Sequence, residues 1–331
     1  MVHIPPMKRV KYLKRNLKKL FELSSTVEKK YVEKYGLNFN ELYPSSPRAF
    51  LKYIPLAWWT DIYTTIMDKL KKDNKLNRIY YVDLLAGSGI TFIREHNKII
   101  AGSALVANYF NRHPYDKVYL GEKNPSRCKV LRRSMEIIKE IKWSRLDCYI
   151  PCTSAEKLIS EIDRQLENEE RYHMFAFIDF EGPADVDWRY LEKLLRHPGD
   201  VMINFQIKGV LRNRNRITFL RKVYGDDLEI QTGMDENYYL EKYIERLRKT
   251  GREYAYPIRI NDRITGRFRR GKKGKYYYYL ILAVRKTLSG SPWYNAWFNL
   301  KNWIEAFDAE ITDLEMEIYK GDQKRLNSYF R

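Results

Sequence analysis

Histidine and cysteine are scarce in this chain of 331 residues, which contains five of the former and three of the latter. The three cysteines, Cys128, Cys148 and Cys152, cannot all pair, and the last two lack Cys-x-x-Cys spacing. We therefore expect them to be small buried side chains in an intracellular, cytoplasmic protein kept in a reducing compartment. Because the histidines are few and scattered, no metal site is predicted.

Long apolar runs are also missing, since no stretch of 18 apolar residues and no signal-peptide core occurs. The sequence therefore predicts no membrane partner and no membrane span. Acidic residues are outnumbered, with 42 Asp and Glu against 61 Lys and Arg and a net charge of +19. Such an excess favours a polyanionic partner, nucleic acid first, although a basic surface that serves solubility alone is the alternative. Abundant Lys, Arg, Glu and Tyr with few Gln would suit a thermophile.

The stretch on which the chain is organised runs from Tyr80 to Phe92 and reads Tyr-Tyr-Val-Asp-Leu-Leu-Ala-Gly-Ser-Gly-Ile-Thr-Phe. It predicts a buried strand that ends near Asp83, then a glycine turn, then a loop leading to a helix. The Lys-Ser/Thr pair of a P-loop is absent, which argues against a triphosphate ligand. Phe92 stands where a dinucleotide fingerprint would carry its third glycine, so the stretch does not match that fingerprint. A carboxylate beside such a turn suits a ligand with hydroxyl or amino groups, and a turn without any ligand is the alternative.

Further polar residues follow the next expected strands. Lys117 to Gly121 reads as the second strand, and Glu122 follows it. An acid at this position can accept hydrogen bonds from a ribose diol, whereas a plain surface glutamate is the alternative. Asp147 to Cys152 reads as a short third strand that leads to Ser154 and Ala155, which would border an adenine ring.

The fourth expected strand, 174–178, is followed by Asp179, Phe180, Glu181 and Gly182, and the fifth, 200–205, contains Asn204. Helices are expected at 103–110, with Ser103 as the cap, and at 128–141, 158–166 and 188–195. Five strand–helix units in sequence predict an α/β fold with a doubly wound, mostly parallel sheet. Ligands of such sheets bind outside the carboxyl ends of the strands, where Asp83, Glu122, Asp179 and Asn204 would meet.

The N-terminal region, 1–50, is predicted to be a basic helical extension. Its helix, 8–35, carries apolar residues that include Leu17 and Leu20 at spacings of three and four. This helix either packs its apolar stripe on the body or serves as a nucleic-acid arm. A second helix is expected at 54–72, and the domain proper is predicted to span 51–331.

Two basic insertions are expected in that domain. The first, 208–222, contains Lys208, Arg212, Arg214 and Arg216 and would hold phosphates beside the site, with a solvated helix end as the alternative. The second, 259–275, reads as a loop. The aromatic stretch 276–284 predicts a strand that would form a C-terminal antiparallel hairpin with the segment after Trp293, and a last helix is expected at 303–319.

Four segments together resemble a known family. They are Tyr81-Val-Asp-Leu-Leu-Ala-Gly-Ser-Gly, Gly102-Ser-Ala-Leu-Val-Ala, Phe177-Ile-Asp-Phe-Glu-Gly and Asp200-Val-Met-Ile-Asn-Phe. They resemble the three-Cys-motif partner protein (TcmP) family over about residues 58 to 205, and the first resembles motif I of class I methyltransferases. This resemblance implies a Rossmann-like methyltransferase domain with S-adenosylmethionine as cofactor.

The resemblance also implies a role for each site residue. Asp83, Ala86, Gly87, Ser88 and Gly89 would hold the methionine portion of the cofactor and Glu122 its ribose. Ser154 and Ala155 would border the adenine. Asp179 would lie near the sulfonium, orienting the acceptor or accepting its proton, and Glu181 is the second catalytic candidate.

The first hypothesis is thus an S-adenosylmethionine-dependent methyltransferase that acts on DNA or RNA. The family usually has Asp-Pro-Phe-Gly where this chain has Asp179-Phe-Glu-Gly, and the missing proline favours a second hypothesis. In that case the chain binds nucleic acid with a methyltransferase-like fold and lacks catalytic activity. A small-molecule methyltransferase is a third hypothesis, but it would leave the net charge of +19 without a function. A protein partner is compatible with the sequence, and the oligomeric state is left open.

Overall fold

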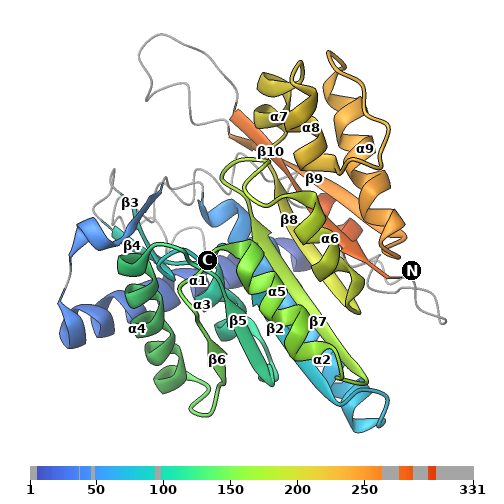
Figure 1. Cartoon of the computed structure of the whole chain (residues 1–331). Coiled ribbons are helices and arrows are strands. Elements are labelled where there is room, and N and C mark those ends of the chain that lie inside the picture. Colours follow the sequence, from blue (N-terminus) through green and yellow to red (C-terminus); the bar gives the residue numbers. More distant parts are fainter. Residues whose placement is uncertain are drawn as a thin grey trace.

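A computed structural model describes residues 6–36, 38–45, 49–93, 98–262, 276–285 and 297–302. Its centre is a seven-stranded sheet with the strand order β6-β5-β2-β7-β8-β10-β9 (Figure 1). Five strands are parallel: β2 (Arg78–Asp83), β5 (Lys117–Leu120), β6 (Cys148–Tyr149), β7 (Tyr172–Asp179) and β8 (Gly199–Phe205). β10 (Tyr276–Val284) runs antiparallel to both β8 and β9 (Tyr254–Asp262). The protein therefore has an α/β fold with a mostly parallel sheet.

The direction of the strand order reverses beside β2. From β2 the chain moves outward to β5 and β6, and it then returns to the other side of β2 to form β7 and β8. Ligands of open parallel sheets bind at such a switch point, outside the carboxyl ends of the strands. Asp83 and Asp179, the last residues of β2 and β7, lie at this point.

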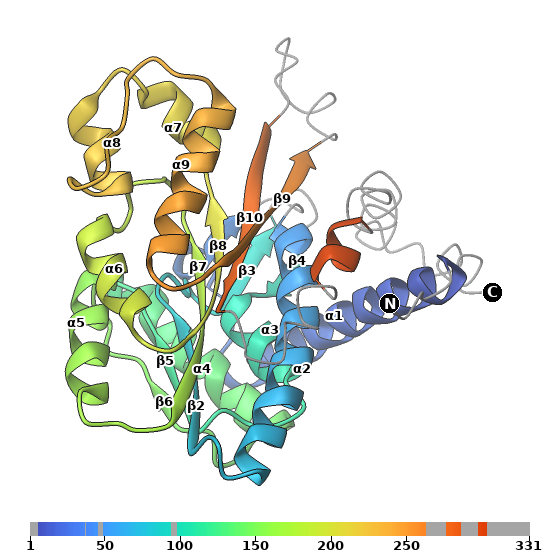
Figure 2. The ribbon, with the colours of Figure 1, turned by 90° about the vertical axis from the view of Figure 1, so that its right-hand side faces the viewer.

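Helices cover both faces of the sheet because both faces of its strands are apolar (Figure 2). Tyr81 faces one hydrophobic core together with α1 (Pro6–Tyr35), α2 (Ala49–Lys72), α3 (Ser103–Phe110) and α4 (Pro125–Ile141). Its neighbours Tyr80 and Val82 face a second core with α5 (Ala155–Leu166), α6 (Trp188–Arg196), α7 (Ile207–Asn213), α8 (Ile217–Tyr224) and α9 (Glu236–Lys249). The alternation follows from the two-residue period of a strand.

The glycine turn leads into strands, contrary to the predicted loop and helix. β3 (Ile90–Ile93) pairs antiparallel with β4 (Lys98–Ala101) and parallel with β1 (Tyr43–Ser45), so that a separate three-stranded sheet forms. A short 3-10 helix, η1 (Phe39–Glu41), precedes β1. The apolar residues Ile90, Ile93, Ile99 and Ile100 are buried where β4 packs on α1 and β3 on α4, and this burial outweighs the turn signal of the preceding glycines.

The N-terminal helix packs on the body of the protein. Leu17, Leu20, Leu23 and Val27 are buried in the same core as α2, α3 and α4. Packing of the apolar stripe, one of the two alternatives considered for this helix, is thereby confirmed for Leu17 and Leu20. The division of the chain at residue 50 stays a prediction.

The C-terminal hairpin differs from the predicted one. Its strands are β9 and β10, paired from Tyr254↔Val284 to Asp262↔Tyr276, so residues 259–262 of the predicted basic loop belong to a strand. The partner of β10 therefore precedes it in the chain. Helix α9 was not predicted. The rest of that loop and the helix expected at 303–319 lie outside the described residues.

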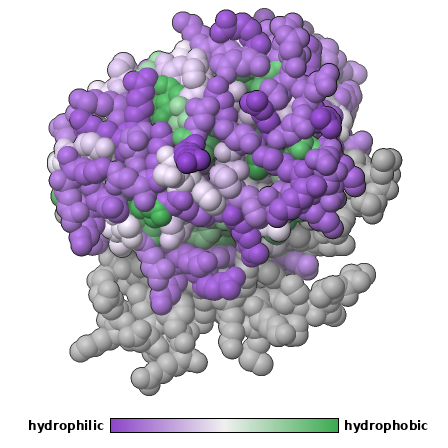
Figure 3. Space-filling view, turned by 90° about the horizontal axis from the view of Figure 1, so that it is seen from below, coloured by the Kyte–Doolittle hydropathy of each residue, from purple (hydrophilic) through white to green (hydrophobic). Residues whose placement is uncertain are grey.

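Seen from below, the described surface is mainly hydrophilic, with only small apolar areas (Figure 3). No helix in the described part of the chain is long and apolar enough to cross a membrane.

Candidate functional site

A cavity of about 490 Å³ opens at the carboxyl ends of the parallel strands. Its volume falls within the range of small-molecule and cofactor sites, roughly 300–1,000 Å³. The walls come from the segments that follow β2, β5, β6 and β7, and from α2. Eight of the predicted site residues line it: Ala86, Gly87, Glu122, Ser154, Ala155, Asp179, Glu181 and Asn204.

The glycine turn is fixed to the neighbouring strand end by backbone hydrogen bonds. Ala86 N donates to Gly121 O at 2.8 Å, and Gly121 N donates to Asp83 O at 2.8 Å. Gly89 has a φ of 72°, and a Cβ there would lie 2.9 Å from Leu131 Cδ1. Only glycine combines this left-handed conformation with such close packing. Ser88 and Gly89 are consequently packed behind the turn and do not line the cavity.

Asp83 also lies behind the cavity wall and is fully buried. It accepts hydrogen bonds from Leu85 N and Tyr81 Oη, each at 3.3 Å, and it interacts with the Ser103 hydroxyl. Burial raises the pKa of Asp83 to about 7, against the opposing effect of these donors. The N-cap of α3 is Gly102, one residue before the predicted Ser103, whose hydroxyl interacts with Asp83.

Helix starts shape the opposite wall of the cavity. Glu122 accepts a hydrogen bond from Asn124 N at 2.6 Å, and Asn124 in turn caps α4 through Arg127 N at 3.1 Å. Ser154 caps α5 by accepting from Lys157 N at 3.4 Å. Both capping segments hold their residues in place before any ligand binds.

Asp179 is engaged on both of its oxygens. Oδ2 pairs with the Lys52 ammonium from α2, and Oδ1 accepts a hydrogen bond from Asn204 Nδ2 at 2.6 Å. The Lys52 and Asp179 side chains are only 17% and 16% exposed. Burial alone would lower the pKa of Lys52, but Asp179 and the neighbouring tyrosines raise it above its ordinary value. Lys52 is therefore a permanent cation in this wall.

The turn after Asp179 is held by a carboxylate. Asp185 Oδ2 accepts hydrogen bonds from Glu181 N at 2.8 Å and from Gly182 N at 2.7 Å. These two bonds restrain the backbone at Glu181 and Gly182. Glu181 lies at the exposed rim of the cavity.

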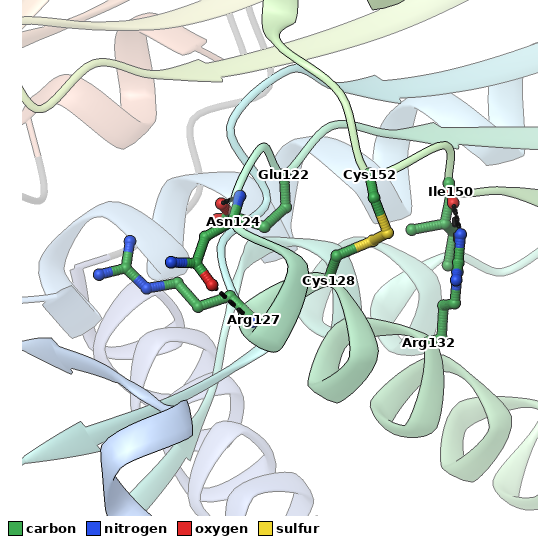
Figure 4. The surroundings of a disulfide bond; sticks show 7 residues. All are labelled: Glu122, Asn124, Arg127, Cys128, Arg132, Ile150 and Cys152. Carbon is green, nitrogen blue, oxygen red and sulfur yellow. Dashed lines mark hydrogen bonds between the residues drawn. A yellow bond between two sulfur atoms is a disulfide. The ribbon is translucent and has the colours of Figure 1, made fainter.

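The expectation that all three cysteines are unpaired is wrong. Cys128 on α4 forms a disulfide with Cys152, just before Ser154 (Figure 4). Cys148 is free and partly buried. The sequence argument failed because a separation of 24 residues says nothing about spatial proximity. The prediction of a reducing compartment thereby loses its premise.

The predicted phosphate-binding residues lie on α7 and just after it. Arg212, Arg214 and Arg216 are exposed. Lys208 lies 4.0 Å from the centre of the Tyr277 ring, and Arg259 lies 3.9 Å from the same centre. Because α7 starts directly after Gln206, which lines the cavity, these cations adjoin the site without forming its wall.

Sequence reasoning missed Lys52, Tyr53, Thr91 and Asp185, all of which line the cavity. One signal was available, since Lys52 is the only charged residue in the otherwise apolar stretch 49–59. Among the described residues, no group of three or more His, Cys, Asp or Glu side chains could hold a metal ion.

Comparison with known proteins adds little to this geometry. No family model matches the chain, and no curated protein matches it either. A crystal structure of a Legionella pneumophila protein (strain Philadelphia 1), described under the family name DUF519, is similar to it with a TM-score of 0.42 and 11% identity. That similarity covers 75% of this chain and 92% of the other.

Proposed function

We propose that the cavity binds S-adenosylmethionine and that the protein transfers its methyl group to a nucleic acid. One observation carries the proposal: a single cavity joins Gly87, Glu122, Ser154 and Asp179, which follow four parallel strands at the switch point. The sheet also has the mostly parallel order and the C-terminal antiparallel hairpin expected of a Rossmann-like methyltransferase.

In this proposal each wall meets one part of the cofactor. The backbone of Ala86 and Gly87 permits close approach of the methionine portion, and the Glu122 carboxylate accepts from the ribose hydroxyls. Ser154 and Ala155 border the adenine. Asp83 acts from behind the wall by holding the turn, because its side chain does not reach the cavity.

Methyl transfer needs positioning more than covalent help, because the sulfonium already supplies the leaving group. Asp179 is bound by both Lys52 and Asn204. Because both of its oxygens are already engaged, Asp179 fits a role in positioning the acceptor better than a role as the acceptor of the substrate's proton. Glu181, at the rim, is the carboxylate with freer access to a bound acceptor.

The experiment is calorimetric titration of the full chain with S-adenosylmethionine and S-adenosylhomocysteine. We expect both to bind, and we expect Glu122→Ala to weaken both by about tenfold, or roughly 1.4 kcal/mol. Asp179→Ala should leave cofactor affinity within about tenfold while abolishing transfer. Glu192→Ala, on α6 and outside the cavity, is the control. Absence of binding by both compounds would refute the proposal.

The doubly bound Asp179 also favours the second candidate, a nucleic-acid-binding protein without catalysis, because both oxygens of this carboxylate are already engaged. This candidate predicts salt-sensitive nucleic-acid binding with no heat on titration of either cofactor. In both candidates the basic surface next to the cavity binds nucleic acid. They differ in whether S-adenosylmethionine occupies the cavity.

A further inference from the structure

The Cys128–Cys152 disulfide joins two walls of the cavity. Cys128 lies in the first turn of α4, directly after Arg127, and Cys152 directly precedes Thr153 and Ser154. Arg127, Thr153 and Ser154 all line the cavity. Figure 4 shows the bond spanning the space between the helix start and the loop. Nothing about the cofactor itself requires a covalent link there.

The backbone of Cys152 depends on that link. Its φ is 47°, in the left-handed region that a residue other than glycine occupies only when its surroundings impose it. The disulfide supplies this restraint. Without it, Cys152 is free to return to negative φ, and a rotation there redirects Thr153 and the Ser154 cap of α5.

Other contacts hold the loop before Cys152, and those after it begin at Ser154, which caps α5. Arg132 on α4 donates to Ile150 O through Nε at 3.2 Å and Nη2 at 2.7 Å. β6 pairs with β5 at Tyr149↔Tyr119. These contacts end at Ile150 and the next ones begin at Ser154, so loss of the disulfide releases Cys152 and Thr153 at the cavity and leaves the sheet edge in place.

We propose that this disulfide is a redox-controlled latch on the cofactor cavity, which binds its ligand tightly when the bond is closed and weakly when it is open. The inference rests on the proposed function for the identity of the ligand. The opening of the wall is a separate claim that can be measured without any ligand.

The reductant is a dithiol, either a small molecule or a thiol–disulfide oxidoreductase. Its thiolate attacks Sγ of Cys152, which is partly exposed, whereas Cys128 is fully buried. The Cys128 thiolate leaves, favoured by its place in the first turn of a helix, and takes up a proton. The second sulfur of the reductant then displaces Cys152. In sum, two electrons and two protons pass to the protein, and the dithiol becomes a disulfide.

The test compares the full chain before and after treatment with dithiothreitol. Thiol counting under denaturing conditions should give one free thiol before reduction and three after, because Cys148 is free in both states. Hydrogen exchange should rise in the segment 151–156 on reduction and stay unchanged in β7. The affinity for S-adenosylhomocysteine should fall by about tenfold.

Matched variants distinguish the effect of losing the disulfide from a general loss of folded structure. Cys128→Ser/Cys152→Ser should bind as weakly as the reduced chain and ignore the reductant, whereas Cys148→Ser should respond as the wild type does. Cys128→Ser/Cys152→Gly should regain affinity without a disulfide, because glycine adopts the left-handed conformation freely. The reduced wild type carries no substitution, so its circular dichroism shows whether the fold survives.

The outcomes distinguish the two proposals. Three thiols before reduction, unchanged exchange in 151–156, or binding of S-adenosylhomocysteine with equal affinity to both forms would each overturn the latch. If exchange in 151–156 rises on reduction but neither form binds S-adenosylhomocysteine, the redox-controlled opening of the wall stands and the cofactor assignment fails.

Discussion

The Lys52 ammonium and the Asp179 carboxylate form an ion pair across 127 positions of sequence, inside the cavity wall. Removing one partner leaves the other charge poorly solvated, because both side chains are less than one-fifth exposed. Lys52→Met should therefore lower the free energy of unfolding by about 3 kcal/mol, as measured by urea denaturation.

The control for this pair is Lys139→Met, which removes a 2.9 Å contact to Glu136, whose side chain is 55% exposed. That change should cost less than about 1 kcal/mol. Adding Asp179→Asn to Lys52→Met should cost less than the two single effects combined. Equal losses in the Lys52 and Lys139 variants would contradict the importance of burial.

Asp83 should make stability depend on pH in the direction opposite to that of an ordinary paired carboxylate. Its folded pKa of about 7 lies above the unfolded value, so the folded state holds a proton that the unfolded state releases. The free energy of unfolding of the wild type should fall relative to that of Asp83→Asn as pH rises from about 4 to 7. Above about pH 7 the difference should stay constant. The total is on the order of 4 kcal/mol.

Asp187→Asn should change the pH dependence of the free energy of unfolding in the opposite direction. A hydrogen bond from Arg189 lowers the pKa of Asp187, so its contribution is present at neutral pH and is lost as pH falls. Thermal or chemical denaturation between about pH 4 and 7 checks Asp83→Asn, and the same measurement at falling acidic pH checks Asp187→Asn. A pH-independent difference between wild type and Asp83→Asn would show that Asp83 is ionised in the fold.

Gly87 and Gly89 should differ in their tolerance of alanine. Both have positive φ, 61° and 72°, but a Cβ at Gly87 meets nothing within 4 Å, whereas one at Gly89 meets Leu131 at 2.9 Å. Gly87→Ala should cost only the conformational strain of about 1 kcal/mol. Gly89→Ala adds overpacking of about 1–3 kcal/mol. Matched unfolding curves would reveal the order, and equal costs would mean that the packing behind the turn relaxes.

The disulfide should also stabilise the fold as a whole. Closing a loop of about 25 residues restricts the unfolded chain and is worth about 3 kcal/mol in the chain-entropy account. Cys128→Ser/Cys152→Ser should lose that amount in guanidinium denaturation, and Cys148→Ser should lose much less. If the oxidised chain and the double variant unfold at one midpoint, the bond contributes nothing to stability.

The arginines on and after α7 should carry the salt dependence of nucleic-acid binding. Each phosphate contact that is lost reduces the slope of log K against log salt by about 0.9 for duplex DNA. Replacing Arg212, Arg214 and Arg216 by alanine should flatten the slope by up to about 3. Lys72, Lys75 and Arg78 at the opposite edge of the sheet are the matched control, and replacing them should leave the slope unchanged.

Much of the sheet was predictable because its strands are local signals. The apolar runs that became β2, β7 and β8 are buried on both faces, and each was expected within two residues of its observed bounds. Parallel order then brings their carboxyl ends to one edge, which placed Glu122 and Asp179 beside the glycine turn. Helix α9 was missed because two of the residues in its buried stripe, Tyr239 and Tyr243, are tyrosines. With Leu247 they stand among charged residues, so the sequence shows no clear apolar periodicity there.

The sequence by itself determined the α/β class, the position of the glycine turn and the strand ends that surround the cavity, because these follow from local periodicity and chain order. Only the tertiary structure decided that Lys52 pairs with Asp179, that Asp83 lies behind the wall, and that Cys128 bonds to Cys152. Each of these depends on a contact between segments distant in sequence, and on burial, which no local pattern encodes.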